Sequence, residues 1–377
     1  MNPLDAPPEY LDIPAEEQED FYSDDDLFKI QSWGADLSFR ELISRYDEDE
    51  LIKPELQRHY VWDKSEASRF IDSILLGLPV PSIFLAKTKN EKLLIVDGYQ
   101  RLMTVRDYVK GIFSKDGKVF KLSRSEKVHS KWKGKAFTEL DDDEQRRIRN
   151  TTIHAIIFMQ RSPETGDTSL YQIFERINSS GKTLLPQEIR NCVYQGPLNT
   201  LLLQLNENNT WRQLFGKHEI DNRMRDVEYI LRFFALSSDE IIHSDNAPSR
   251  ISLKKYLNQY MDANNSKSVI DELERKFINA IQKTHDALGD SAFHNISQTN
   301  PDQLVDRFSP TLFDSILIAF YLAERDGLSM PSPDEAFRRK LRLLSDPNYQ
   351  SLLTQETMRI PNIRSRINQA YNAIFEG

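Results

Sequence analysis

The spacing of apolar residues divides the chain into two parts of different fold class. After Leu198, every apolar segment repeats its hydrophobic residues at the spacing of an amphipathic helix. Before Leu198, helical segments alternate with short apolar runs typical of strands, such as 82–88 and 92–98 around a turn at 89–91. The sequence therefore predicts an α+β domain over 30–195 and an all-α domain over 196–377. The helical segments of the second domain are 198–208, 224–236, 252–262, 269–288, 311–324, 334–344 and 365–375.

The N-terminal head is far more acidic than the rest of the chain. Residues 1–28 contain ten acidic residues, four prolines and no Lys or Arg, so we expect a disordered head over 1–29. The formal net charge of the chain is −9, whereas the residues beyond the head hold 49 basic and 48 acidic side chains. Two interpretations of the head stay open: a solubilising tail, or a tail that competes with nucleic acid for a basic groove.

Cysteine content and hydropathy favour a cytoplasmic protein. Cys192 is the single cysteine, which excludes an internal disulfide and a cysteine zinc site. The mean hydropathy is −0.57, and no apolar run approaches the roughly 18 residues of a membrane span. The N-terminus has neither a basic region nor an apolar region of the signal-peptide type. We therefore expect no membrane partner.

A basic segment with an interleaved aromatic residue lies between Lys115 and Lys135. It holds eight basic residues and two acids, with Trp132 among them. Positive charge beside an aromatic ring suits phosphate contacts combined with base stacking. The alternative is an ordinary solvated loop. The candidate nucleic-acid contacts are Lys127, Lys131, Trp132, Lys133 and Lys135.

The segment KLLIVDGYQRLMTV predicts a strand, a turn at Asp97–Gly98 and a helix that opens with Gln100 and Arg101. A helix N-terminus attracts phosphate, and glycine lets a ligand approach the backbone closely. Arg101 adds a fork of donors suited to phosphate. This pattern indicates an anion site, and a purely structural Asp–Gly turn is the alternative.

Other patterns of catalytic chemistry are weak. The segment SSGKT at 179–183 lacks the spacing of a phosphate-binding P-loop and follows a helix rather than a strand, so we reject that interpretation. The histidines are scattered and form no metal-ligand spacing. We see no catalytic triad.

Four motifs in one order resemble the DGQQR-motif family. They are PELQRHYVW, LLIVDGYQRLMTV, FERINSSGKTLLPQEIRN and RMRDVEYILRFFAL. That family is typified by the N-terminal domain of the GmrSD modification-dependent restriction endonucleases and of the phosphorothioate-sensing SspE effectors. The resemblance implies a ParB/sulfiredoxin-like core over 30–195. It also implies nucleotide binding and hydrolysis that license DNA restriction.

The resemblance places roles on matching residues of this chain. Asp97 and Arg101 would be catalytic, with Asp97 also the candidate ligand for Mg²⁺. The cofactor would be a nucleoside triphosphate (ATP, GTP or CTP) with Mg²⁺. The remaining nucleotide-binding residues would be Gln57, Arg58, Gly98, Tyr99, Gln100, Arg176, Asn178 and Arg190.

Two departures from the family pattern leave the function open. Tyr99 replaces the first glutamine of the motif, and a phenol cannot replace both amide functions. No HNH nuclease motif is visible. We therefore expect an NTP-hydrolysing module of a bacterial restriction or anti-phage system that acts on or senses DNA, including modified DNA, and works with a separate nuclease or defence subunit. The alternatives are a sensor without hydrolysis and, more weakly, a ParB-like nuclease that uses Asp97 and Glu188.

Overall fold

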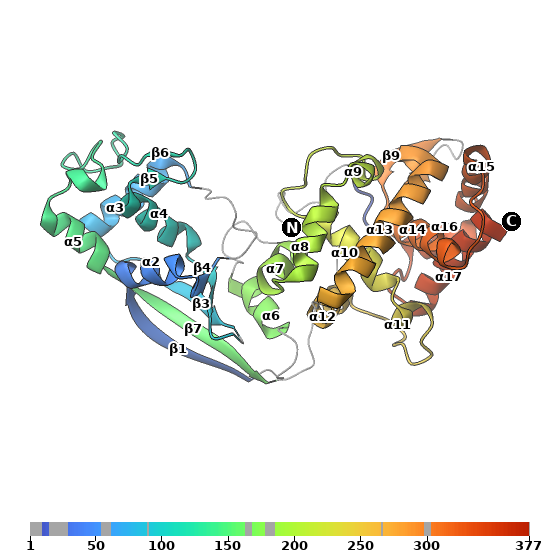
Figure 1. Cartoon of the computed structure of the whole chain (residues 1–377), viewed down its shortest axis with the longest axis horizontal. Coiled ribbons are helices and arrows are strands. Elements are labelled where there is room, and N and C mark those ends of the chain that lie inside the picture. Colours follow the sequence, from blue (N-terminus) through green and yellow to red (C-terminus); the bar gives the residue numbers. More distant parts are fainter. Residues whose placement is uncertain are drawn as a thin grey trace. The chain divides into compact units, whose positions relative to one another are not determined.

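The computed structural model describes residues 10–14, 29–53, 62–88, 90–162, 168–177, 185–264, 267–297 and 303–376 (Figure 1). The chain forms two compact units. The α/β unit comprises Asp26–Gly181 with Asn191–Val193, and the helical unit comprises Met1–Asp25, Lys182–Arg190 and Tyr194–Gly377. The domain boundary expected from the sequence at 195/196 stays a prediction.

A mixed five-stranded sheet organises the α/β unit. Its strand order is β1-β7-β3-β4-β2. The pairs β1·β7 and β3·β4 are antiparallel, whereas β7·β3 and β4·β2 are parallel. The strands 82–88 and 92–98 predicted from the sequence are confirmed as β3 and β4, whereas β1 was not predicted. The bounds are β1 Lys29–Ser38, β2 Leu51–Ile52, β3 Ile83–Lys87, β4 Leu93–Asp97 and β7 Thr152–Ser162.

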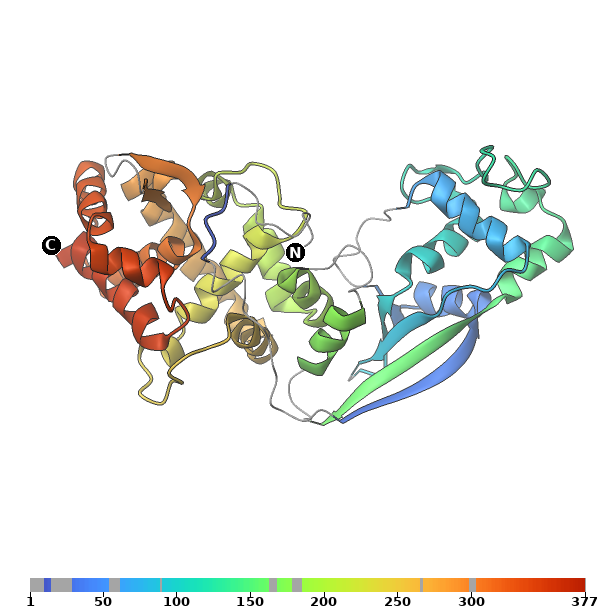
Figure 2. The same ribbon diagram turned by 180° about the vertical axis from the view of Figure 1, so that it is seen from behind.

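The helices α2 to α5 gather on one side of the β1–β7 ribbon (Figure 1, Figure 2). Side-chain caps fix where they begin: Ser38 accepts from the N–H of Glu41, and Asp63 forms a reciprocal capping box with Glu66. The bounds are α2 Phe39–Asp47, α3 Lys64–Leu75, α4 Tyr99–Lys110, α5 Asp142–Asn150 and α6 Thr168–Ile177, with a small hairpin of β5 Ile112–Phe113 and β6 Lys118–Val119.

An apolar core forms where these helices meet the sheet. Leu85 of β3 and Ile95 of β4 are buried against helical side chains such as Ile71 and Leu102. Tyr108 of α4 packs edge-on against Phe120, with ring centroids 5.1 Å apart. Burial of this apolar surface fixes β4 and α4 relative to each other. The junction between them is therefore held rigidly.

The second unit consists mainly of helices around a buried central helix. All seven helical segments predicted after Leu198 are confirmed. Asp314 of the central helix α14 is fully buried and accepts hydrogen bonds from Arg232 at 2.6 Å and Arg366 at 3.2 Å. The bounds are α7 Pro186–Val193, α8 Pro197–Asn206, α9 Asn209–Phe215, α10 Arg225–Leu236, α11 Asp239–Ile242, α12 Leu253–Ala263, α13 Lys267–Leu288, α14 Pro310–Arg325, α15 Pro333–Leu344, α16 Pro347–Thr354 and α17 Ile360–Tyr371.

Two features of the helical unit correct the predictions. The unit is not all-α, because β8 (His294–Ile296) pairs with β9 (Leu304–Phe308). Residues of the head also belong to it: the N–H of Asp12 donates to Phe308 O, and the N–H of Phe308 donates to Tyr10 O, both at 2.9 Å. Strands this short carry too few residues to show an alternating pattern.

In the described ranges, no helix is both long and apolar enough to span a membrane.

Candidate functional site

The β4–α4 junction has a backbone conformation that favours glycine. Gly98 has φ = +101°, and a Cβ atom there would lie 2.2 Å from Cγ2 of Ile83. The backbone conformation and the packing against Ile83 therefore both require glycine at this position. These two requirements add to the one expected from the sequence, that a ligand can approach the backbone closely. No side chain caps α4 among the described residues. The start of a helix carries a partial positive charge that favours a bound anion.

Arg101 is held in place at the start of α4. Its Nη2 donates to Oδ2 of Asp97 at 2.5 Å, and its Nη1 donates to the carbonyl oxygen of Pro81 at 3.1 Å. The Arg101 side chain is 13% exposed and that of Asp97 is 43% exposed. The guanidinium is thus fixed in one position, while the carboxylate faces the solvent.

A pocket of about 410 Å³ opens at this junction. This volume lies within the roughly 300–1,000 Å³ of ordinary small-molecule sites. Gln100 of α4 is connected to the segment at Trp62, because its Oε1 accepts a hydrogen bond from the backbone N–H of Trp62 at 3.3 Å. The Trp62 ring packs edge-on against Phe70, with centroids 5.6 Å apart. The pocket is lined by Trp62, Phe70, Pro81, Asp97, Gly98, Tyr99, Gln100 and Arg101.

Tyr99 directs its polar end into the protein. The residue is 4% exposed, and its hydroxyl interacts electrostatically with that of Tyr46 on α2. Burial, together with the interaction with Tyr46, raises the pKa of Tyr99 above its ordinary value. Tyr99, which stands in place of the motif's first glutamine, therefore belongs to the interface between α2 and α4, where it interacts with Tyr46. A direct contact between Tyr99 and a nucleotide stays a prediction.

The structure brings together only part of the predicted set. Asp97, Gly98, Tyr99, Gln100 and Arg101 share one pocket. Gln57, Arg58 and Asn178 lie outside the described residues. Arg176 lies in the last turn of α6, with an exposed side chain.

Arg190 belongs to the buried interior of the helical unit. Its Nε donates to Asn258 at 2.8 Å, and its Nη1 donates to Gln187 at 3.0 Å and to Glu228 at 2.8 Å. The residue is 1% exposed. These contacts explain why α7 begins inside the helical unit. A role of Arg190 in nucleotide binding stays a prediction.

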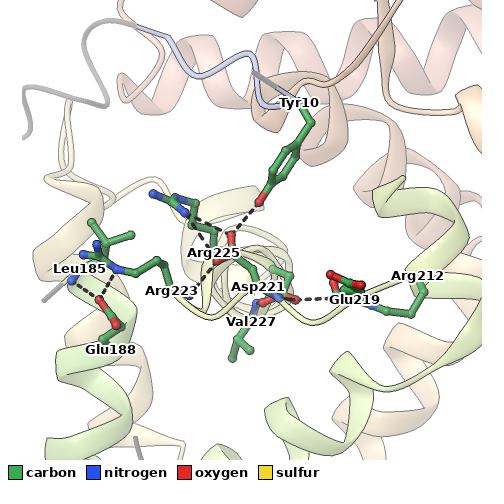
Figure 3. Close-up of polar contacts among 10 residues, drawn as sticks. Tyr10, Leu185, Glu188, Arg212, Glu219, Asp221, Arg223, Arg225 and Val227 are labelled. Atoms are coloured by element: carbon green, nitrogen blue, oxygen red, sulfur yellow. Dashed lines mark hydrogen bonds and ion pairs between the residues drawn. The ribbon is translucent and has the colours of Figure 1, made fainter. Parts of the chain in front are cut away.

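Glu188 takes part in a network at the start of α7 (Figure 3). Its carboxylate accepts from the N–H of Leu185 at 2.6 Å and from Nε of Arg223 at 2.9 Å. Figure 3 also shows Asp221, which accepts from the hydroxyl of Tyr10 at 2.8 Å and pairs with Arg225. This network was not predicted from the sequence, although the alternation of acids and arginines in EIDNRMRD is a signal for it.

The described residues contain no group of three His, Cys, Asp or Glu side chains that could hold a metal ion. Asp97 and Glu188 belong to different compact units, and the nuclease alternative that uses both stays a prediction. Asp97 stays a candidate ligand for a metal ion that arrives with the nucleotide. Mg²⁺ is commonly bound by one or two carboxylates together with substrate phosphates, and a single half-exposed carboxylate fits that pattern.

The aromatic part of the nucleic-acid prediction is wrong. Trp132 is 6% exposed and belongs to the core, where its indole N–H donates to Glu144 at 2.6 Å. Lys131 is exposed but pairs with the same carboxylate at 2.6 Å. The ring is therefore not available to stack on a base. Contacts of Lys127, Lys133 and Lys135 with DNA stay predictions.

The β4–α4 junction lies within a range of the chain that matches a known protein family. Residues 39–195 match the family model described as the GmrSD restriction endonuclease, N-terminal domain. The resemblance predicted from the sequence is thereby confirmed over this range, which includes the whole β4–α4 junction. Comparisons with curated proteins and with solved structures gave no match. The ParB/sulfiredoxin-like assignment of the core stays a prediction.

Proposed function

We propose that the GmrSD-type domain binds a nucleoside triphosphate at the β4–α4 junction and hydrolyses it in a bacterial defence system. One observation carries the proposal: the uncapped start of α4 opens into a pocket beside the fixed Arg101–Asp97 pair. The backbone N–H groups after Gly98 would bind phosphate oxygens, and Arg101 would add a fixed positive charge. The carboxylate of Asp97 would hold the cation of the nucleotide or orient water.

Hydrolysis needs little more than positioning and charge compensation. A water oxygen attacks the terminal phosphorus, the bond from that phosphorus to the bridging oxygen breaks, and a nucleoside diphosphate and inorganic phosphate leave. Mg²⁺ bound to the nucleotide would neutralise charge on the phosphate oxygens. Asp97 would exchange its contact with Arg101 for the cation and the water, which frees donors of Arg101 for the phosphates. Pro81 O keeps the guanidinium in place during this exchange.

Phosphate release measured on the full chain with ATP, GTP and CTP tests this function. Arg101→Ala and Asp97→Ala remove the two charged groups of the pocket, and we expect both to abolish turnover. Arg106→Ala is the matched control, because Arg106 lies on the same helix but pairs with Asp47 at 2.9 Å. Nucleotide affinity that is unchanged in Arg101→Ala, with folding intact, would place the binding site elsewhere.

A sensor without hydrolysis is the second candidate function. The observation that favours it is the Arg101–Asp97 pair itself, since a carboxylate bound to arginine is less available to a metal ion or to water. Isothermal titration separates the two functions: saturable binding of a nucleotide without phosphate release, in the presence and absence of DNA, supports the sensor. In either case the partners we propose are DNA, including modified DNA, and a separate nuclease subunit.

A further inference from the structure

The segment that follows the β5–β6 hairpin folds back on itself and brings basic residues together. The N–H of Leu122 donates to Lys135 O, and the N–H of Gly134 donates to Leu122 O, both at 2.9 Å. A Cβ atom on Gly134 would lie 3.1 Å from Nε of Arg124, so the Arg124 side chain lies across the glycine backbone. The guanidinium is therefore next to the chain positions of Lys133 and Lys135.

Most positive charge of this surface is not neutralised by an acid. The segment 110–136, which the structure describes throughout, contains two acids. Asp116 pairs with Lys64 at 3.5 Å, and Glu126 is exposed. Uncompensated positive charge of this density favours a polyanionic partner. The basic face, as we call it, consists of five residues of this segment that form no ion pair within the described part of the chain: Lys118, Arg124, Lys127, Lys133 and Lys135.

An exposed apolar pair lies beside the basic face. Ile112 of β5 and Val119 of β6 are cross-strand partners, and they are 48% and 54% exposed. Cross-strand partners point to the same side of a hairpin, so the two side chains form one apolar ridge, next in the chain to Lys118. Proteins that bind DNA use aliphatic side chains of this kind as wedges against base steps.

The same surface is poorly suited to a single strand or to a membrane. The Phe and Trp side chains within 110–136 are Phe113, Phe120 and Trp132, and none of them is more than 6% exposed. Single-stranded nucleic acid is bound largely by stacking of its bases on aromatic rings. Binding to a lipid surface scales with the buried apolar area, which is small for a ridge of two side chains. Duplex DNA therefore fits this combination of groups best.

We infer that the basic face and the Ile112–Val119 ridge bind duplex DNA, with the five cations on backbone phosphates and the ridge in a groove. The choice of DNA as partner rests on the proposed function, but the inference does not depend on nucleotide hydrolysis. Phosphate contacts carry no sequence information, and aliphatic side chains lack hydrogen-bonding groups. We therefore expect modified and unmodified duplexes to bind this face with affinities within about threefold of each other.

Fluorescence anisotropy of a short labelled duplex, titrated with the full chain at several salt concentrations, tests the inference. Five phosphate contacts predict a slope of about −4.5 for the logarithm of the binding constant against that of the salt concentration. The affinity should thus fall about 500-fold between about 50 and 200 mM salt. Replacing Arg124, Lys133 and Lys135 together by Ala should reduce the size of the slope by about 2.7 and weaken binding at least about 10-fold at about 100 mM salt.

A second triple variant controls for net charge. Lys29, Arg40 and Lys92 are exposed residues of the same unit that lie outside the basic face. Replacing these three by Ala removes the same charge from the chain, and the salt slope should keep its wild-type value. Thermal unfolding of each variant checks that the fold is kept.

The apolar ridge has its own pair of variants. Ile112→Ser combined with Val119→Ser should weaken duplex binding about fivefold through lost apolar contact and leave the salt slope unchanged, because no ion is released by that contact. Ile30→Ser is the matched control, because Ile30 is 44% exposed but lies on β1, away from the hairpin (Figure 1). Duplex affinity should be unchanged in that variant.

The outcomes separate this inference from the proposed hydrolysis. Unchanged affinity and slope in the triple variant of the basic face would mean that DNA binds elsewhere. A wild-type protein that binds no duplex, with or without nucleotide and Mg²⁺, would also overturn the inference, whereas phosphate release still decides whether nucleotide is hydrolysed. Tighter binding of a single strand than of the duplex, or binding of phosphatidylserine-containing vesicles in place of DNA, would assign the face to a different partner.

Discussion

The guanidinium of Arg101 and the carboxylate of Asp97 form a hydrogen-bonded ion pair of 2.5 Å across the first turn of α4. The pair neutralises the arginine at the point where the helix terminus attracts anions. A ligand that binds there must either compensate Asp97 with a cation or overcome its repulsion. We therefore expect anion binding there to depend on a divalent cation.

We predict that Asp97→Asn separates anion binding from turnover. Without the carboxylate, Arg101 attracts phosphates directly, so affinity for tripolyphosphate in the absence of Mg²⁺ should rise about fivefold. Phosphate release from Mg²⁺–nucleotide should fall at least about 100-fold, because the group that holds cation and water is lost. Titration calorimetry and a phosphate-release assay measure the two effects.

Asp47→Asn is the control for Asp97→Asn. Asp47 contacts Arg106 and Lys110 of the same helix at 2.9 Å and 2.7 Å, so its removal also deletes an acid next to α4. We expect no gain in tripolyphosphate binding in that variant. A similar gain in both variants would mean that only the net charge of the domain had changed.

Gly98→Ala should destabilise the α/β unit for two separable reasons. The positive φ of +101° strains any L-residue by about 1 kcal/mol, and the added methyl group would collide with Ile83. Gly111 at the other end of α4 has φ = +86°, but a Cβ atom there would meet nothing within 4 Å. Gly111→Ala therefore introduces backbone strain without a collision. The amount by which Gly98→Ala lowers the free energy of unfolding beyond Gly111→Ala measures the cost of the collision with Ile83. Equal losses in both variants would show that Ile83 moves aside without cost.

The elements that the sequence predicts well are those whose signal is local. The seven helical segments predicted after Leu198 repeat apolar residues every three or four positions, and all seven are helical in the structure. The β4–α4 junction was equally readable, because an apolar strand, a glycine and a helix follow one another within KLLIVDGYQRLMTV.

The features that the sequence could not predict depend on distant partners. The hydroxyl of Tyr10 reaches Asp221, 211 positions along the chain. Trp132 stands in a basic segment, yet its ring joins the core because the carboxylate of Glu144 accepts its N–H. The edge strand β1 alternates polar and apolar residues from Ser32 to Leu37. Gly34 and Asp36 within it are residue types that strands disfavour, and its register is specified by pairing with β7.

Glu144 should make the stability of the α/β unit depend on acid pH. Burial alone would raise its pKa, but hydrogen bonds from Lys131 and Trp132 outweigh that effect and lower the pKa to about 2. A lowered pKa stabilises the fold above the ordinary value near 4.5, and the contribution is lost as the pH falls from 4.5 towards 2. The free energy of unfolding of the wild-type protein should therefore exceed that of Glu144→Gln by up to about 3 kcal/mol at pH 7. This difference should be smaller at pH 3.

Chemical denaturation at several pH values measures this dependence. Asp143→Asn is a suitable control, because Asp143 lies on the same helix and its carboxylate is 90% exposed in a pair with Arg146. Asp143→Asn should change the free energy of unfolding by no more than about 0.5 kcal/mol at every pH. A gap between the wild type and Glu144→Gln that does not vary with pH would mean that packing, and not the charge of Glu144, holds Trp132.

The segment around Tyr10 should stabilise the hairpin strand β9. Leu11 is 5% exposed, and its neighbours Tyr10 and Asp12 exchange backbone hydrogen bonds with Phe308. Leu11→Asp would place a charge in this apolar contact and detach the segment. The amide of Phe308 would then lose its acceptor and exchange hydrogen faster. Asp12→Ala is the matched control, since the Asp12 side chain is exposed and only its backbone is used. Hydrogen exchange followed by mass spectrometry on the full chain should show faster exchange over 304–308 in Leu11→Asp alone, and unchanged protection there would show that β9 is stable without the head.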